Sequence, residues 1–151
     1  MRLALLVHLL ASIIWIGGMF FAYVALRPAA ARLLEPPQRL TLWCETLSRF
    51  FLWVWISIFA IHATGFHMLG AAYGMRSVPA YVLTMFGIAA FMTLIFAYIY
   101  FVPYKALVVG VGVGNWKQAG AAMNRIRVLV ATNLTLGLLT VTVAVIGGLL
   151  A

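Results

Sequence analysis

Hydrophobic residues form four long runs along the chain, and short polar segments separate them. The runs cover approximately residues 3–26, 50–75, 78–102 and 128–151, and none of them contains a lysine, an arginine or an acidic residue. A helix needs about 20 predominantly apolar residues to cross the hydrocarbon core of a bilayer. The pattern therefore predicts an all-α, polytopic membrane protein with a single domain, residues 1–151, built as an antiparallel bundle of four transmembrane helices.

The connecting segments predict how these helices begin and end. The first run should end at Arg27–Pro28, because a proline disfavours helical geometry for the residue before it. The segment RPAAARLLEPPQRLTLWCETLSR then reads as a short amphipathic helix, a break at Pro36–Pro37 and a second helix that continues into the second run. Asn115, with Gln118 three residues later, fits the start of a helix that continues into the fourth run.

Composition and charge set the environment and the orientation. The chain is 66% hydrophobic and 8% charged, whereas soluble domains are about 25% charged. Basic residues near span ends are retained on the cytoplasmic side, and the segments after the first and third runs with their flanks hold eight of them: Arg27, Arg32, Arg39, Arg49, Lys105, Lys117, Arg125 and Arg127. The other side holds Arg2 and Arg76. We therefore expect a bacterial inner-membrane protein with both termini in the periplasm, and we expect no nucleic-acid partner.

Three histidines, and no acidic residue, lie within the runs. At about 1.5 Å per residue, His8 lies roughly 8 Å below the periplasmic end of its helix, with His67 and His62 about 10 and 20 Å below that end of theirs. At about 100° per residue, His67 lies at the edge of the small and polar face of the second helix, and His62 points toward lipid. His8 and His67 are thus the expected pair, and Trp15 shares the helix face of His8.

Two imidazoles at one depth on antiparallel helices suit the axial ligation of a haem iron. Because the chain has no C-x-x-C-H motif, the haem would be noncovalent haem b. Trp15, Gly18, Gly65 and Phe66 would line the slot. This hypothesis predicts a redox or electron-transfer role with a quinone or a protein as redox partner; an enzyme of this kind would be a haem-dependent membrane oxidoreductase.

Copper handling is the first alternative, because thioether and imidazole groups suit copper(I). Met19, Met68 and Met75 supply sulfur near His8 and His67, and Cys44 is the single cysteine, so no thiol pair exists in one chain. His62 is the less favoured ligand in either case, and its predicted lipid-facing position suggests a homodimer along that side of the second helix. The second alternative is a structural or accessory subunit.

The fourth run carries small and polar residues along one face at spacings of 4, 3, 4 and 3: Asn133, Gly137, Thr140, Ala144 and Gly147. Small residues allow helices to approach closely within lipid. This stripe is interpreted as a packing surface, with Asn133 making a hydrogen bond between helices.

Several stretches together resemble the CopD-like family of bacterial inner-membrane proteins: HLLASIIWIGGMFF, ALRPAA, EPPQRL, RFFLWVW, ATGFHML, YFVPYKAL and NLTLGLLT. The family is named for copper resistance and is similar to the HemJ-type protoporphyrinogen oxidases, which bind b-type haem. The resemblance implies that His8 is the first-span histidine of the family and Thr64–Gly65 its second-span motif. Relatives often carry histidines in the third span, where this chain has Tyr81 and Tyr98, so His67 or His62 would replace the second ligand.

Overall fold

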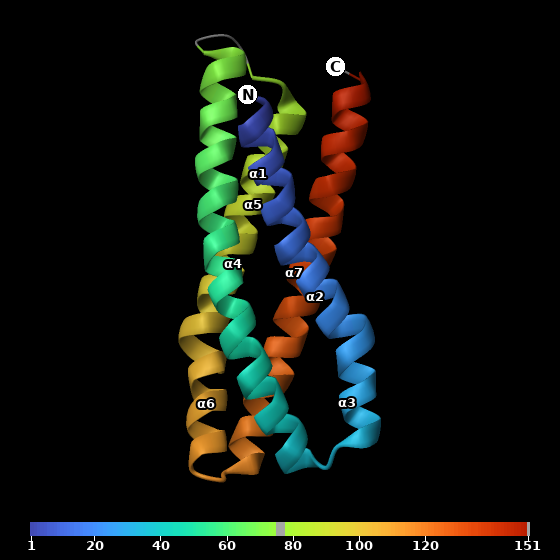
Figure 1. Cartoon of the computed structure of the whole chain (residues 1–151), viewed down its shortest axis with the longest axis vertical. Coiled ribbons are helices and arrows are strands. Elements are labelled where there is room, and N and C mark those ends of the chain that lie inside the picture. The colour runs from blue at the N-terminus through green and yellow to red at the C-terminus, as the bar shows by residue number, and fades with distance from the viewer. Residues whose placement is uncertain (75–77, 151) are drawn as a thin grey trace.

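A computed structural model describes residues 1–74 and 78–150, and it consists of four long helical rods packed side by side (Figure 1). The rods cover Arg2–Leu33, Pro36–Tyr73, Ala80–Gly112 and Trp116–Leu150, and each is long and apolar enough to cross a membrane. The described residues contain no strand. The predicted all-α bundle of four membrane-spanning helices is thereby confirmed. Met75 and Arg76, which carried two sequence predictions, lie outside the described residues.

The two ends of the bundle differ in what they contain. Figure 1 shows the N-terminus and the C-terminus at the same end, which we call the terminal end. The opposite end, which we call the basic end, holds the two remaining connections and the segments that carry eight of the ten basic residues. The structure thus gathers the positive charge at one end of the rods.

The first rod is an α-helix interrupted by two π-helical turns. It runs through α1 (Arg2–Ser12), the π-helical turn η1 (Ile13–Gly17), α2 (Gly18–Phe20), the π-helical turn η2 (Phe21–Leu26) and α3 (Arg27–Leu33). The predicted end at Arg27–Pro28 is therefore wrong. Pro28 enters the rod at the start of α3, directly after the wider turn, where a missing backbone N–H is tolerated.

The second rod is a single helix, α4 (Pro36–Tyr73), and it begins at the predicted break. Leu34 is extended, with φ −122° and ψ 136°, and this residue ends the first rod. Glu35 and Gln38 form a capping box at the start of α4, and Pro36 occupies the first helical position. The break therefore precedes the two prolines rather than falling on them.

The third and fourth rods also extend beyond the predicted apolar runs. The third consists of α5 (Ala80–Ile99), the π-helical turn η3 (Tyr100–Tyr104) with Pro103 inside it, and α6 (Lys105–Gly112). The fourth is the single helix α7 (Trp116–Leu150), and Asn115 Oδ1 accepts a hydrogen bond from the Gln118 backbone N–H at 3.1 Å. The apolar pattern identified only the part of each helix suited to lipid, whereas the helices continue toward the basic end.

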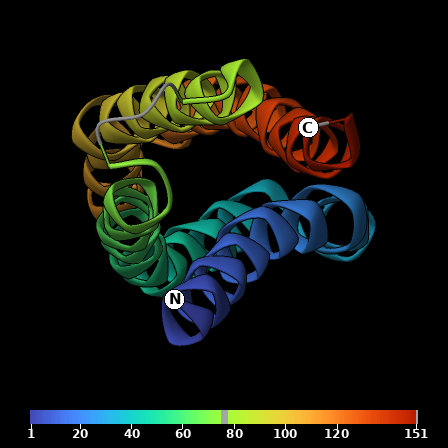
Figure 2. The ribbon, with the colours of Figure 1, turned by 90° about the horizontal axis from the view of Figure 1, so that it is seen from above.

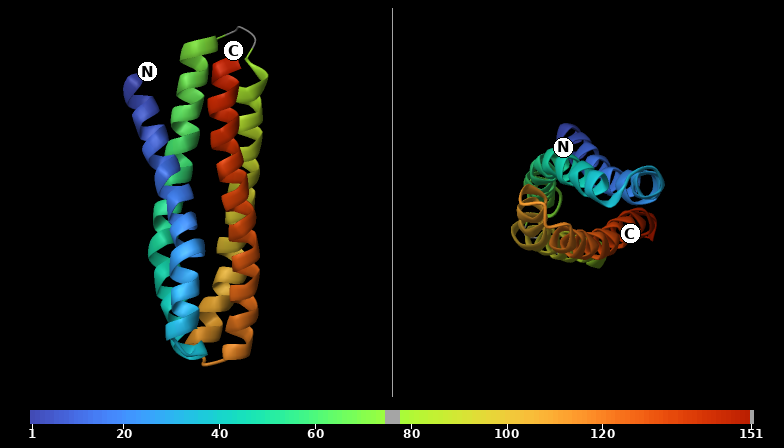
Figure 3. Two further views of the ribbon diagram at one scale, coloured as in Figure 1. Left: turned by 90° about the vertical axis from the view of Figure 1, so that its right-hand side faces the viewer. Right: turned by 90° about the horizontal axis from the view of Figure 1, so that it is seen from below.

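Consecutive rods form two pairs at the terminal end. There α1 packs on α4, and α5 packs on α7. Seen from above, α1 and α7 stand apart (Figure 2), and Figure 3 shows the same arrangement from two further sides. Toward the basic end the pairs close on one another, because α4 contacts both α6 and α7.

Aromatic side chains join the two pairs in the middle of the bundle. The ring of Phe96 lies 5.2 Å from that of Phe51 and 5.1 Å from that of Trp55, measured between ring centroids. We call this group the central aromatic cluster: Trp15, Phe51, Trp55, Phe96, Tyr100 and Tyr104. Edge-to-face contacts of this kind add about 0.5–1.5 kcal/mol each beyond the area they bury.

Some residues of the small and polar stripe of α7 pack against neighbouring helices, as predicted. Asn133 is buried, and its side-chain N–H donates to the backbone carbonyl of Met92 at 3.1 Å, so the predicted bond between helices is confirmed. A Cβ atom at Gly137 or Gly147 would lie 2.9 Å or less from a neighbouring side chain. These glycines therefore permit close helix approach. Thr140 and Ala144 line a cavity, and Gly137 lines it as well.

Candidate functional site

A cavity of about 410 Å³ lies between the two helix pairs at the terminal end. Its volume is within the range of roughly 300–1,000 Å³ that is typical of small-molecule sites. All four rods contribute to its wall, which is mostly apolar. Its polar and sulfur-bearing lining residues are His8, Ser12, Trp15, His62, Met68, Tyr73, Tyr81, Met85, Met92 and Thr140, together with Met1 at the chain start.

The hydrogen bonds of His8 determine which of its ring nitrogens carries the proton. His8 Nδ1 lies 2.9 Å from the hydroxyl oxygen of Thr64. That hydroxyl donates its own hydrogen to the backbone carbonyl of Ala60, so toward His8 it acts as an acceptor. His8 Nδ1–H is therefore the donor, and the lone pair of the neutral imidazole lies on Nε2.

His62 has the same tautomer for a simpler reason. Its Nδ1 lies 2.8 Å from the backbone carbonyl oxygen of Ile58, one helical turn earlier. A carbonyl can only accept a hydrogen bond, so Nδ1–H donates and the lone pair again lies on Nε2. Imidazoles that ligate metals typically donate their other ring N–H to an oxygen in this way.

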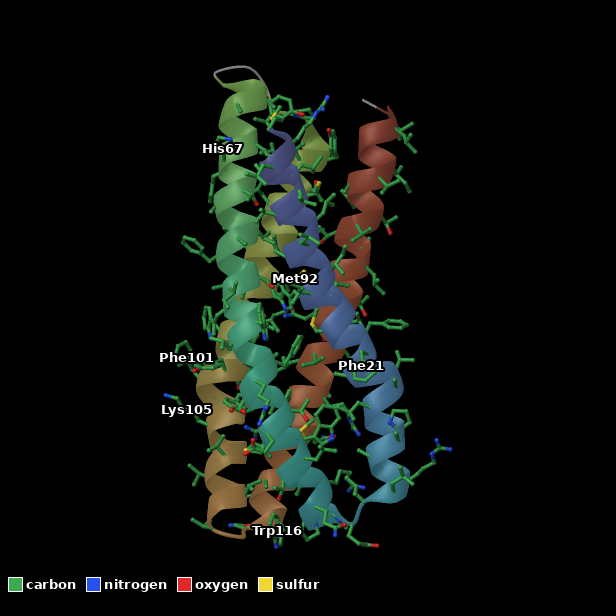
Figure 4. The ribbon with its side chains drawn as sticks, in the orientation of Figure 1. Phe21, His67, Met92, Phe101, Lys105 and Trp116 are labelled. Atoms are coloured by element: carbon green, nitrogen blue, oxygen red, sulfur yellow. The ribbon has the colours of Figure 1, made fainter. Side chains whose placement is uncertain are left out.

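The methionines of the lining come from more than one helix. Met68 lies on α4 with His62, whereas Met85 and Met92 lie on α5, in the opposite helix pair. Met92, labelled in Figure 4 near the middle of the bundle, is 3% exposed. The cavity therefore combines imidazole nitrogens from the first pair of helices with thioether sulfurs from both pairs.

Gly65 lies beside the imidazole of His8 and the ring of Phe86. A Cβ atom at this position would lie 3.7 Å from His8 Cε1 and 3.3 Å from Phe86 Cζ. Phe86 itself lines the cavity, and its ring packs against that of Phe66 at 5.2 Å between centroids. The structure thus places Gly65, a predicted site residue, in the cavity lining beside His8.

The structure does not bring His67 to the cavity. His67 is exposed on the outer side of α4, as Figure 4 shows, and it does not line the cavity, whereas His62 does. The predicted directions of these two side chains are therefore the reverse of those observed. The reason is that Thr64, on the small and polar face of α4, contacts His8 of α1, whereas the cavity lies on the neighbouring face around Gly65. The homodimer was expected because His62 was predicted to point toward lipid, and this reason no longer applies. The homodimer itself stays a prediction.

Two further residues predicted for a haem slot lie elsewhere. Phe66 is 61% exposed. Gly18 lies toward the basic end, where the ring of Phe50 covers it and leaves no room for a Cβ atom. Trp15, also predicted for the slot, lines the cavity and is 2% exposed.

The floor of the cavity is closed. Trp15 and Met92 belong both to the cavity lining and to the hydrophobic core, and the ring of Phe96 lies 6.3 Å from that of Trp15 between centroids. Below this level the buried core continues between the rods toward the basic end. Trp15 Nε1–H is buried and has no hydrogen-bond partner within the described part of the chain.

Sequence reasoning missed several lining residues. Tyr73, Tyr81 and Thr140 were not predicted as site residues, and neither were Met85 and Met92. One sequence signal could have indicated part of this lining. Ile61, Gly65 and Leu69 are spaced four residues apart, so they share one face of the helix, and this face differs from the small and polar face. The residue pattern alone did not distinguish which of the two faces looks into the bundle.

Together the fold and the cavity define a multi-pass helical membrane protein with an imidazole- and thioether-lined pocket at one end. The chain belongs to the CopD family, described as copper resistance protein D, whose profile matches residues 44–146, about two thirds of the chain. His62 and the methionines of α4 and α5 lie inside the matched segment, and His8 lies before it. Neither a curated protein nor a solved structure gives a significant match. The likeness to HemJ-type oxidases stays a prediction.

Proposed function

We propose that the protein binds a copper ion in the terminal cavity as cargo, and that His8 and His62 are its nitrogen ligands. One observation carries the proposal: both imidazoles donate from Nδ1 to an oxygen, keep the lone pair on Nε2, and line the same cavity. This arrangement of ring nitrogens is the one that metal-bound histidines adopt. Membership of a family described by copper resistance supports the choice of metal.

The donor set favours copper(I) over harder metals. The described residues contain no group of three or more histidine, cysteine or acidic side chains that could hold a metal ion. Methionine must therefore complete any site here, and Met68, Met85 and Met92 line the cavity. Thioether and imidazole ligands suit copper(I), whereas calcium, magnesium and manganese prefer oxygen ligands.

The closed floor favours capture and release at the terminal end. A continuous path to the basic end would have to pass the central aromatic cluster, whose side chains are packed against one another. The concentration of basic residues at the other end supports a periplasmic position for the cavity in a bacterial inner membrane. We therefore propose a protein that holds or hands over copper on the periplasmic side.

Competition for copper(I) tests this proposal. The purified protein in detergent is titrated against a chromogenic copper(I) chelator, alongside His8→Ala, His62→Ala and the control His67→Ala. We expect one copper per chain, at least tenfold weaker binding in the first two variants, and a change of less than twofold in the control. Equal affinities in all four proteins would refute the assignment.

Haem b is the second candidate, and the size and aromatic lining of the cavity favour it. Trp15, Phe86 and Tyr81 line a cavity of about 410 Å³. It ranks second because His8 and His62 come from helices that pack directly on each other, whereas axial ligands approach an iron from opposite sides of the porphyrin. A Soret band in protein expressed with ample haem, lost in His8→Ala, would reverse the ranking and restore the predicted redox role with a quinone or protein partner.

A further inference from the structure

A second, narrower crevice lies toward the basic end, between the first rod, α4 and α7. It measures about 40 Å³, and the surface that lines it is wholly apolar. Two arginines contribute their aliphatic stems to this lining, Arg27 from the start of α3 and Arg127 from α7, so their charged ends lie outside the crevice. A small apolar crevice between two cations requires an explanation, because cations near lipid are costly unless they are paired or reach the headgroup layer.

The chain itself supplies little negative charge to these arginines. It has ten basic residues and only two acidic ones, Glu35 and Glu45. The contacts that the structure gives the two arginines are with uncharged groups. The Arg27 guanidinium lies 4.9 Å from the centre of the Tyr23 ring, and Arg127 Nη2 donates to the Asn124 side-chain oxygen. Both guanidinium groups therefore retain their capacity to bind an anion.

The two arginines stand at matching levels relative to the lipid. Arg27 is the first charged residue after the apolar run 3–26, and Arg127 is the last one before the run 128–151. Each of them therefore lies where a helix passes from the hydrocarbon core into the headgroup layer. Ala22 and Val130, which also line the crevice, lie on the hydrocarbon side of this level.

We propose that this crevice is a binding site for an anionic phospholipid, with Arg27 and Arg127 on its phosphate and the start of an acyl chain against Ala22 and Val130. Charge complementarity selects the headgroup, and the position at the end of the apolar runs selects a lipid over a soluble anion. Basic pockets between transmembrane helices on the cytoplasmic side are known to hold anionic headgroups. The site is separate from the terminal cavity and does not depend on the proposal for copper.

Native mass spectrometry of the whole protein in a neutral detergent provides the test, with phosphatidylglycerol as the probe. The double variant Arg27→Gln with Arg127→Gln is compared with Arg32→Gln with Arg125→Gln. The control pair removes the same charge from exposed positions on the same two helices. We expect phosphatidylglycerol binding to be at least tenfold weaker in the crevice variant than in the control pair, and phosphatidylcholine binding to be equal in both.

Two further measurements keep the proposal testable if the glutamine variants fold poorly. The Lys variants of Arg27 and Arg127 should retain binding, and Ala22→Leu should weaken it although both arginines remain. Equal phosphatidylglycerol binding in crevice and control variants, or unchanged binding in Ala22→Leu, would overturn the proposal. Displacement of the lipid by millimolar inorganic phosphate would also overturn it, because the site would then be selective for a soluble anion.

Discussion

A single hydroxyl group determines how His8 presents itself to the cavity. Thr64 is held by a hydrogen bond to its own helix, and this bond turns its oxygen into an acceptor for His8 Nδ1–H. The threonine therefore acts on any bound metal through the imidazole and does not itself touch the metal. Its role is to fix the ring orientation and the tautomer.

Replacing Thr64 with valine should weaken copper(I) binding by about 10–100-fold, because loss of such a supporting bond has this typical cost. Thr64→Ser should retain binding, since the hydroxyl remains. The measurement is the same chelator competition. Thr132→Val is the matched control, because Thr132 is exposed and its hydroxyl bonds only to a carbonyl of its own helix. A loss of affinity in Thr132→Val equal to that in Thr64→Val would contradict the assigned role.

Helical periodicity predicted the cavity-facing residues of the first span but not those of α4. The inward positions of span one were predicted correctly, because His8, Ser12 and Trp15 all line the cavity. On α4 the same reasoning failed, because the small and polar face was taken as the face that looks into the site. Thr64 on that face contacts His8 of α1, and the cavity face is centred nearer Gly65, so His62 lines the cavity and His67 does not.

The helix ends that depend on short local motifs could be predicted from the sequence. The break before α4 and the cap at Asn115 followed from short motifs, and both are present. The ends of the first and third rods did not follow, because Pro28 comes just after a π-helical turn, Pro103 lies inside one, and the helix continues in both cases. Sequence periodicity contains no signal for a local change of pitch.

The hairpin of α6 and α7 depends on a glycine with no room for a side chain. A Cβ atom at Gly110 would lie 2.9 Å from the backbone nitrogen of Ala119. Gly110→Ala should therefore destabilise the protein by about 1–3 kcal/mol, the usual cost of overpacking. Thermal unfolding in detergent measures the effect. Gly120→Ala is the control: its Cβ would meet nothing within 4 Å, and stability should stay the same or rise by about 0.5–1 kcal/mol.

The bond between Asn133 and the Met92 carbonyl joins α7 to α5 near the cavity floor. Asn133→Ala should lower the free energy of unfolding by about 0.6–1.7 kcal/mol, the range for hydrogen bonds between transmembrane helices. Thr135→Ala provides the comparison, because Thr135 is exposed and bonds to a carbonyl of α7 itself. A smaller loss in Asn133→Ala than in Thr135→Ala would argue against a role in joining the helices.

At the scale of the whole molecule, the distribution of charge predicts the orientation in the membrane. Eight basic residues at one end and both termini at the other predict periplasmic termini. Alkaline phosphatase fused after residue 151 should therefore be active in intact bacteria, and green fluorescent protein fused there through the general secretion route should be dark. The opposite result would place the cavity on the cytoplasmic side and move the proposed copper exchange there.

The pairing of consecutive rods has a consequence for biosynthesis. The pairs α1 with α4 and α5 with α7 are each made of neighbours along the chain, so each can assemble as soon as its own two rods have been translated. The terminal cavity needs the second pair, because Thr140 and Ala144 of α7 form part of its wall. A nascent chain stalled before residue 140 therefore lacks a finished pocket, although His8 and His62 are already in place on the first pair.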